Sequence, residues 1–290
     1  MTRFTRAAVA TAALTLATAG AQAITLVGLT SAHELARIDT GNIAGATTTA
    51  ITGLALGDRL VGIDERPADG KLYGVSLSNK VYTVDVTTGA ATFVAALSAP
   101  VIQANLGYGI DFNPAADFAG GSSLRLVSSA GSNFAINAGT GAVGNAASNI
   151  GNGYTAVAYS NSMPMPTMAP PSTALYYIDT NTDTLRMAPG AFNAPTIGLV
   201  GALGVDALKA NGFDIANGRG YAALNVDAGT SLATGIYGID LATGNATLLG
   251  TYNGTLSGLT VSAVPEPQTY AMLLAGLVAV GAMARRRRSA

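Results

Sequence analysis

One hairpin pattern recurs along the middle of this 290-residue chain, at intervals of roughly 50 residues. Each copy has a strand with a small or aromatic centre, a tight loop, and a second strand that ends in an apolar residue followed by Asp or Asn. Several copies are followed by Thr-Gly and a further strand, as after Thr88-Gly89 and Thr243-Gly244. Units of about 50 residues with four short strands are typical of propeller blades. The copies begin at Leu26, Leu72, Leu124, Leu175 and Gly220.

A second pattern opens each following unit. Gly62–Ala68 (Gly-Ile-Asp-Glu-Arg-Pro-Ala) matches Gly109–Ala115 (Gly-Ile-Asp-Phe-Asn-Pro-Ala), and Gly212–Ile215 is a shorter copy. Ala156–Tyr159 and Gly258–Val261 occupy the equivalent places without Asp. These segments are predicted to be the first strand of each unit.

The order of the strands suggests how the domain closes. The repeats begin with the second strand of a unit, near Leu26, and end with an unpaired first strand, Gly258–Ser262. Joining the two would complete one blade and remove free sheet edges. We therefore predict an all-β fold over residues 24–263, a five-bladed β-propeller-like domain closed by its C-terminal strand. The alternatives are a β-sandwich, which would not need the repeat, and a β-helical array, which would have shorter coils.

Composition excludes several kinds of chemistry. The chain has no Cys, so disulfides, thiol catalysis and Cys-ligated metal sites are ruled out. Between Ile24 and Val264 there are nine basic and fifteen acidic residues, a net charge of −6. Such a domain lacks the basic footprint of a nucleic-acid-binding protein, and its charge favours cations or neutral ligands.

The N-terminus has the three regions of a secretory signal. Arg3 and Arg6 precede an apolar stretch, and Ala21-Gln22-Ala23 offers small residues to a signal peptidase. We predict that residues 1–23 are a signal peptide cleaved after Ala23. The alternative is an uncleaved N-terminal anchor.

The last segment, residues 264–290, has three parts in a fixed order. Val264-Pro265-Glu266-Pro267 comes first, and Tyr270–Ala284 follows as an uncharged apolar stretch. Arg285-Arg286-Arg287-Arg288 ends it as a stop-transfer cluster. We predict a short transmembrane helix with the arginines in the cytoplasm and the preceding domain outside the inner membrane.

This tail resembles the PEP-CTERM sorting signal. The resemblance implies processing by an exosortase near Pro265-Glu266-Pro267, in a Gram-negative bacterium that makes exopolysaccharide. The precursor would be held transiently in the inner membrane, and the mature protein would reach the cell surface or the extracellular space. The alternative is a simple tail anchor, which would not need two prolines flanking a glutamate.

The repeat domain is also similar to an uncharacterised family of bacterial extracellular domains. That family has no established activity, so the resemblance implies fold and location only. The resembling segments are Arg59–Asp64, Leu72–Gly74, Gly109–Pro114, Gly201–Asp206 and Ile239–Gly244.

Three aspartates are the candidate site residues. Asp64, Asp111 and Asp214 share one repeat position, which would lie on the innermost strands of three blades. Carboxylates that converge on a channel could bind Ca²⁺ or support glycoside hydrolysis. The alternative interpretation is that each caps a turn before Pro67 or Pro114 and stabilises the strand end, the role expected for Asp39, Asp85 and Asp240.

No catalytic constellation is evident elsewhere. His33 is the only histidine and cannot form a histidine metal cluster; it is interpreted as a polar loop residue. Asn161–Ser172, rich in Pro and Met, is predicted to be a surface loop. The leading hypothesis is a non-enzymatic surface or matrix protein without a cofactor, whose propeller binds or scaffolds exopolysaccharide. The alternative is a polysaccharide-active hydrolase or lyase that uses the channel aspartates.

Overall fold

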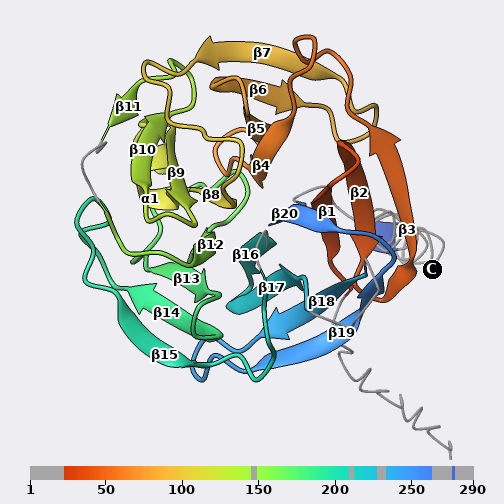
Figure 1. Cartoon of the computed structure of the whole chain (residues 1–290), viewed down its shortest axis with the longest axis vertical. Helices are drawn as coiled ribbons and strands as arrows, with labels where there is room; N and C mark the ends of the chain where they lie inside the picture. The colour runs from red at the N-terminus through yellow and green to blue at the C-terminus, as the bar shows by residue number, and fades with distance from the viewer. Residues whose placement is uncertain (1–22, 145–148, 209–211, 227–232, 263–275, 278–290) are drawn as a thin grey trace, which may run out of the picture.

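The computed structural model describes residues 23–144, 149–208, 212–226, 233–262 and 276–277. The described chain forms five four-stranded antiparallel sheets arranged around a central axis (Figure 1). The predicted five-bladed β-propeller is therefore confirmed.

Each blade is an up-and-down sheet whose first strand lies at the axis. The first blade contains β20 (Leu256–Val261), β1 (Thr25–Thr30), β2 (Glu34–Asp39) and β3 (Asn42–Ala50). The second blade contains β4 (Leu60–Glu65), β5 (Leu72–Ser76), β6 (Lys80–Val84) and β7 (Ala91–Ala96). The third blade contains β8 (Tyr108–Phe112), β9 (Ser123–Ser128), β10 (Asn133–Asn137) and β11 (Val143–Gly144).

The remaining two blades repeat this order. The fourth contains β12 (Tyr154–Tyr159), β13 (Leu175–Asp179), β14 (Thr184–Ala188) and β15 (Gly198–Ala202). The fifth contains β16 (Gly212–Ala216), β17 (Arg219–Leu224), β18 (Thr234–Ile239) and β19 (Ala246–Tyr252).

The last strand closes the ring as predicted. β20 pairs antiparallel with β1, with Val261 opposite Leu26 and Leu256 opposite Thr30. The first blade is therefore built from both ends of the repeat region, and β1 is not left as a free sheet edge.

Apolar side chains fill the spaces between blades. The described residues form five buried clusters, and each joins two neighbouring blades. β5 is buried along its whole length because blades cover both of its faces, whereas most of the outer strand β3 is exposed. This explains why the inner strands read as near-continuous apolar runs.

The Asp-to-Gly turns fasten the outer edges of the blades. Asp85 Oδ1 accepts hydrogen bonds from the backbone N–H groups of Thr87 (2.9 Å) and Thr88 (2.7 Å). Gly89 adopts a positive φ of 72°, which glycine allows without strain. Its carbonyl then accepts a hydrogen bond from Thr52 N–H of the preceding blade at 3.0 Å. The predicted turn role of Asp85 is confirmed.

One helix interrupts the strands. α1 (Pro114–Phe118) follows β8, and Asn113 caps it by accepting hydrogen bonds from Ala115 and Ala116 N–H. Five residues are too few to show a helical period in the sequence. No helix of the described residues is long and apolar enough to cross a membrane.

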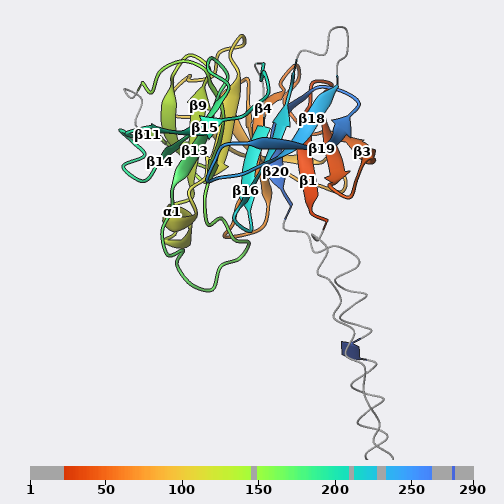
Figure 2. The same ribbon diagram turned by 90° about the horizontal axis from the view of Figure 1, so that it is seen from below.

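The strand directions define two faces of the ring. Thr25 and Ser262 lie at one end of the β1–β20 pair, joined by a hydrogen bond from Ser262 N–H to the Thr25 carbonyl at 2.9 Å. The described propeller therefore begins and ends on one face, the lower side of the ring in Figure 2. We call this the tail face, and the side with the β1–β2 turn the open face.

Candidate functional site: a carboxylate cluster on the axis and a pocket at its mouth

The three predicted aspartates come together on the axis. Asp64 lies on β4, Asp111 on β8 and Asp214 on β16, all innermost strands. Each offers a carboxylate oxygen, and these oxygens lie within 4.8 Å of one another. The side chains are buried, with only 2–6% of each residue exposed. The same repeat position is occupied by Ala158 on β12 and Thr260 on β20.

Two of the carboxylates bind the backbone of the next blade. Asp64 Oδ2 accepts a hydrogen bond from Phe112 N–H at 2.8 Å. Asp111 Oδ1 accepts one from Tyr159 N–H at 3.1 Å. In each case the donor is the residue that follows the equivalent position in the next innermost strand. The aspartates therefore link adjacent blades.

The same arrangement continues across the closing strand. Asp214 Oδ2 accepts a hydrogen bond from Val261 N–H at 2.6 Å, and Thr260 Oγ accepts one from Glu65 N–H at 3.2 Å. Only the blade with Ala158 lacks a side chain that can accept a bond; there Ile215 N–H donates to Asp214 Oδ1 at 2.6 Å. The side chains at four of the five positions thus accept inter-blade hydrogen bonds. The series is interrupted only between the blade with Ala158 and the blade with Asp214.

This geometry corrects the turn-cap interpretation of the three aspartates. The partners of Asp64 and Asp111 lie 48 residues ahead, in the following blade. The turn before Pro114 is capped by Asn113 instead. The turn role holds for Asp85 and for Asp240, which accepts hydrogen bonds from Ala242 and Thr243 N–H.

Thr260 was missed in the sequence because it is not acidic. Its hydroxyl oxygen lies 2.9 Å from Asp64 Oδ1 and 3.0 Å from Asp214 Oδ2. The hydroxyl has one proton, so it can donate to only one of the two carboxylates at a time. The signal that could have found Thr260 was its repeat position, shared with the aspartates.

Burial sets the charge of the cluster. It raises the pKa of Asp64 well above its usual range, and the negative charge of Asp214 adds to the rise. Burial also raises the pKa of Asp111, with further contributions from Asp64 and Asp214. Burial raises the pKa of Asp214 to about 6, against the hydrogen bonds that it accepts. Like charges this close in a dry site disfavour full ionisation, so the three carboxyl groups keep protons to a higher pH than exposed aspartates do.

The channel beside the cluster is almost closed. Small residues (Gly62, Gly109, Ala156, Gly212 and Gly258) line a cavity of about 10 Å³, room for about one water molecule. A Cβ at Gly109 would lie 2.7 Å from Ala156 Cα, so the inner strands approach too closely for a larger residue. The aspartates therefore do not face an open groove.

The cluster has the ligand type that a cation prefers. Ca²⁺ takes six to eight oxygen ligands, and the three carboxylates together with Thr260 could supply several. Most of their oxygens already accept hydrogen bonds from N–H groups, as described above. The cation site at Asp64, Asp111 and Asp214 stays a prediction.

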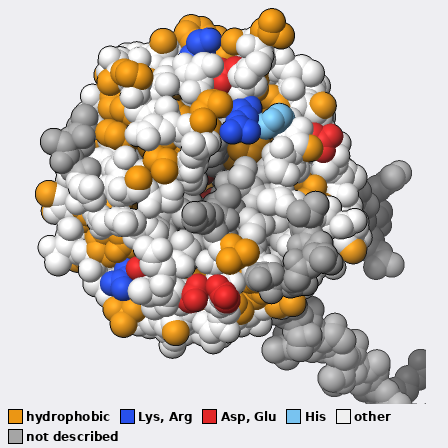
Figure 3. Space-filling model, in the orientation of Figure 1, with side chains coloured by type: hydrophobic (Ala, Val, Ile, Leu, Met, Phe, Trp, Pro, Cys, Tyr) orange, Lys and Arg blue, Asp and Glu red, His pale blue; other side chains and the backbone are white. Residues whose placement is uncertain are grey.

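A second hollow lies on the open face, at the mouth of the channel. We call it the mouth pocket; its volume is about 190 Å³. It spans the β1–β2 turn, the start of β4, the segment before β8, and β20. Figure 3 shows a histidine and a basic side chain side by side on this face. The polar lining residues are Thr30, Ser31, His33, Arg59, Tyr108 and Ser257.

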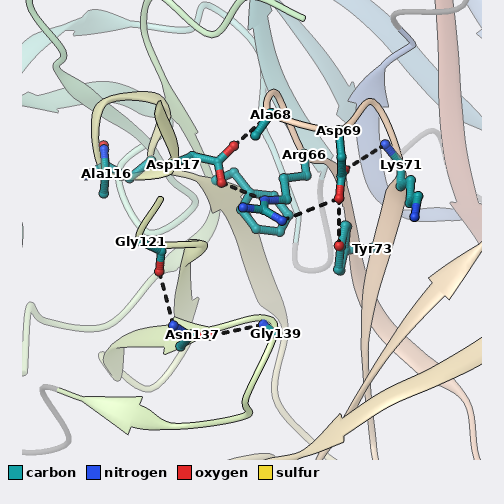
Figure 4. A network of polar contacts seen from close by, with 12 residues as sticks. Arg66, Ala68, Asp69, Lys71, Tyr73, Ala116, Asp117, Gly121, Asn137 and Gly139 are labelled. Atoms are coloured by element: carbon teal, nitrogen blue, oxygen red, sulfur yellow. Dashed lines mark hydrogen bonds and ion pairs between the residues drawn. The ribbon is translucent and has the colours of Figure 1, made fainter. Parts of the chain in front are cut away.

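A polar network on the tail face joins two blades. Arg66 Nε lies 2.6 Å from Asp117 Oδ1, and Asp117 Oδ2 accepts a hydrogen bond from Ala68 N–H at 2.8 Å (Figure 4). Tyr73 OH donates to Asp69 Oδ2 at 2.9 Å. The network anchors α1 against the loop after β4, which assigns these charges a structural role.

The remaining predicted residues lie at the chain ends. Ala23 is the first described residue, while Ala21, the Val264–Pro267 motif and the Arg285–Arg288 cluster lie outside the described residues. The predicted transmembrane stretch Tyr270–Ala284 also lies outside them, apart from residues 276–277.

The loop Asn161–Ser172 is confirmed between β12 and β13, with Met163, Met165 and Met168 exposed.

Solved structures with a similar arrangement are distant in sequence. A nidogen–laminin complex matches with a TM-score of 0.48 and 12% identity, covering 83% of this chain and 98% of that chain. Regucalcin, a calcium-binding protein from Agrobacterium tumefaciens, matches with a TM-score of 0.42 and 16% identity, covering 77% and 68%. A protein of unknown function from Bacteroides thetaiotaomicron matches with a TM-score of 0.48 and 12% identity, covering 79% and 58%. No curated protein matches the chain.

Two families match the sequence itself. Residues 263–288 match the PEP-CTERM protein-sorting motif, which indicates an exported protein that is targeted to exosortase and made as a membrane-anchored precursor. The propeller, over residues 34–260, matches a domain of unknown function, DUF4394. The chain therefore belongs to the DUF4394 family, and it carries its propeller ahead of a PEP-CTERM sorting motif.

Proposed function

We propose that this protein is a cell-surface or extracellular-matrix component whose propeller is a binding or scaffolding module associated with exopolysaccharide. A signal peptidase would remove residues 1–23, and an exosortase would process the tail at Val264–Pro267. Arg285–Arg288 would hold the precursor's C-terminus in the cytoplasm of a Gram-negative cell.

The mouth pocket carries this proposal. It opens on the face opposite the one at which Thr25 and Ser262 lie, since Thr30 and Ser257 are at the far end of the same strand pair. While the tail holds the precursor at the membrane, this face points away from the bilayer. A polymer outside the cell can therefore reach the pocket.

The same geometry disfavours a hydrolase built on the aspartates. Glycosidases hold their two carboxyl groups about 5–5.5 Å apart, or about 6.5–9.5 Å apart when water attacks directly. Here one oxygen of each aspartate lies within 4.8 Å of the others, and the carboxylates are buried and bonded to strand amides, with no open groove between them. A sugar ring cannot enter between them without opening the blades.

The test combines processing with binding. The full chain is expressed in a bacterium with exosortase and in its exosortase-deletion strain, and cell fractions are analysed by immunoblotting. We expect a shortened surface or medium form in the first strain and an uncleaved membrane form in the second. The purified full chain should then sediment with exopolysaccharide from the producing strain. A protein that neither changes fraction nor sediments with the polymer would refute the proposal.

A further inference from the structure

The mouth pocket gathers positive charge without an acidic lining residue. Arg59 and His33 are both exposed and line the pocket from different blades. Arg59 makes no ion pair within the described part of the chain. A free guanidinium presents a planar fork of donors that fits a carboxylate. The pocket therefore has the charge to bind an anion.

The acidic residues next to Arg59 and His33 in the sequence are Asp58 and Glu34. Asp58 Oδ1 accepts hydrogen bonds from the N–H groups of Ser78 (3.0 Å) and Arg59 (2.9 Å). Burial raises the pKa of Asp58, but hydrogen bonding outweighs burial and holds that pKa below its usual value. The charge of Glu34, next to His33, adds to the burial that raises the pKa of Tyr252. Neither carboxylate lines the pocket.

The rest of the lining suits a sugar ring. The lining includes the apolar residues Leu60, Val61 and Leu106, and Ser31, whose hydroxyl is a hydrogen-bonding group. Tyr108 is held in place, because its hydroxyl accepts a hydrogen bond from Gln103 N–H at 2.6 Å. A volume of about 190 Å³ is below the roughly 300–1,000 Å³ of pockets for drug-sized ligands. It has room for one small group.

We propose that the mouth pocket binds a single carboxylate-bearing sugar residue of an acidic exopolysaccharide, with Arg59 and His33 contacting the carboxylate. This inference rests on the proposed function and specifies its ligand. It also revises the expectation from net charge, which favoured cations or neutral ligands. Most of the described acidic residues behind that charge lie on the axis, at turns and on the tail face, and the two beside the pocket residues, Asp58 and Glu34, do not line it.

The experiment measures binding of the purified full chain to oligogalacturonate by calorimetry. The comparison ligands are the same oligosaccharide with its carboxylates reduced to alcohols, and inorganic phosphate. Arg59→Met keeps the apolar stem of the side chain and removes the fork, and Arg59→Lys restores charge alone. Lys71→Met is the matched control, because Lys71 is exposed on the tail face. Circular dichroism verifies that each variant is folded.

We expect wild type and Lys71→Met to bind oligogalacturonate equally, and Arg59→Met to bind about tenfold or more weakly, as for a lost hydrogen bond to a charged group. Arg59→Lys should fall in between. Equal binding of the reduced oligosaccharide, equal binding by Arg59→Met, or displacement by phosphate at the same concentration would each overturn the inference. In those cases sedimentation with exopolysaccharide would still support the proposed function; loss of sedimentation as well would refute both.

Discussion

The hydroxyl of Thr260 lies 2.9 Å from the carboxylate of Asp64, although 196 residues separate them in sequence. Thr260 belongs to the closing strand β20 and Asp64 to the first strand of the next blade. The pair therefore joins the end of the propeller domain to its second blade, beside the β20–β1 seam.

Replacing Thr260 with valine tests this link. The change keeps the shape of the side chain but removes the hydroxyl that contacts Asp64 and Asp214 and that accepts the Glu65 N–H bond. We expect the free energy of unfolding to fall by about 1–3 kcal/mol, the cost of unsatisfied buried polar groups. Urea unfolding at pH 7 gives the measurement. Thr251→Val, at an exposed position on β19, is the control and should change stability little.

Stability should fall as the pH rises. Asp214 has a pKa of about 6 in the folded protein against 3.8 for an ordinary aspartate. A raised folded pKa contributes stability that is fully present below the unfolded value and is lost as the pH rises through the folded value. The difference corresponds to about 3 kcal/mol. Asp64 and Asp111 shift in the same direction, so we expect the free energy of unfolding to decline from pH 5 to pH 8.

Urea titrations at several pH values measure that decline. Asp85→Asn is the matched control, because Asp85 lies in an exposed turn where hydrogen bonds from Thr88 and Thr87 lower its pKa. That variant should keep the wild-type slope between pH 5 and pH 8. A wild-type curve that is flat or rises over this interval would contradict the raised pKa values of the cluster.

Asp111→Asn should separate charge from hydrogen bonding. The amide oxygen of asparagine can still accept the bond from Tyr159 N–H, while the side chain carries no charge. At pH 8 we expect the variant to be more stable than wild type by about 1–3 kcal/mol, since the repulsion with Asp64 and Asp214 is removed. The gain should vanish at pH 4. Chemical unfolding at the two pH values checks both, and lower stability at pH 8 would disprove it.

Calcium distinguishes a cluster that keeps protons from a cation site. Because the carboxylate oxygens accept backbone hydrogen bonds, we expect millimolar Ca²⁺ at pH 8 to leave the melting temperature unchanged. A ligand that binds only the folded state would raise it. A rise in wild type that is lost in Asp64→Asn would instead establish the predicted cation site. Magnesium at the same concentration controls for ionic strength.

Gly109→Ala tests how tightly the inner strands pack. The added Cβ would meet Ala156 Cα at 2.7 Å and Val157 N at 2.9 Å, both backbone atoms. Overpacking of this kind costs about 1–3 kcal/mol, so the melting temperature should drop. Gly190→Ala, where an added Cβ meets nothing within 4 Å, is the control. If the two variants melt together, the inner strands can move apart more easily than the structure implies.

Much of the fold could be predicted because the repeat encodes local structure. Asp85 and Gly89 signal a turn through their own backbone preferences, and the unpaired strand Gly258–Ser262 indicated closure onto Leu26. The helix α1 was not predicted because its five residues span little more than one turn. Its cap Asn113 was visible only as part of a motif that resembled Gly62–Ala68.

The site was predicted only in part. Counting repeat positions placed Asp64, Asp111 and Asp214 on the axis, but no local pattern shows which amide each oxygen meets in another blade. Thr260 was not predicted as a site residue because it carries no charge. The mouth pocket brings together His33, Arg59, Tyr108 and Ser257 from four separate segments. Their proximity depends on how the blades pack, which cannot be predicted from a single sequence.

The seam between β20 and β1 also sets an order of events during export. β20 ends at Val261 and the sorting motif begins at residue 263. During export from the N-terminus, β20 is therefore the last strand of the domain to cross the membrane. Because β20 completes the first blade, the ring can close only after the whole repeat region has been exported. An exosortase cut at the motif would then lie outside the β20–β1 pair and release a propeller with all its blades intact.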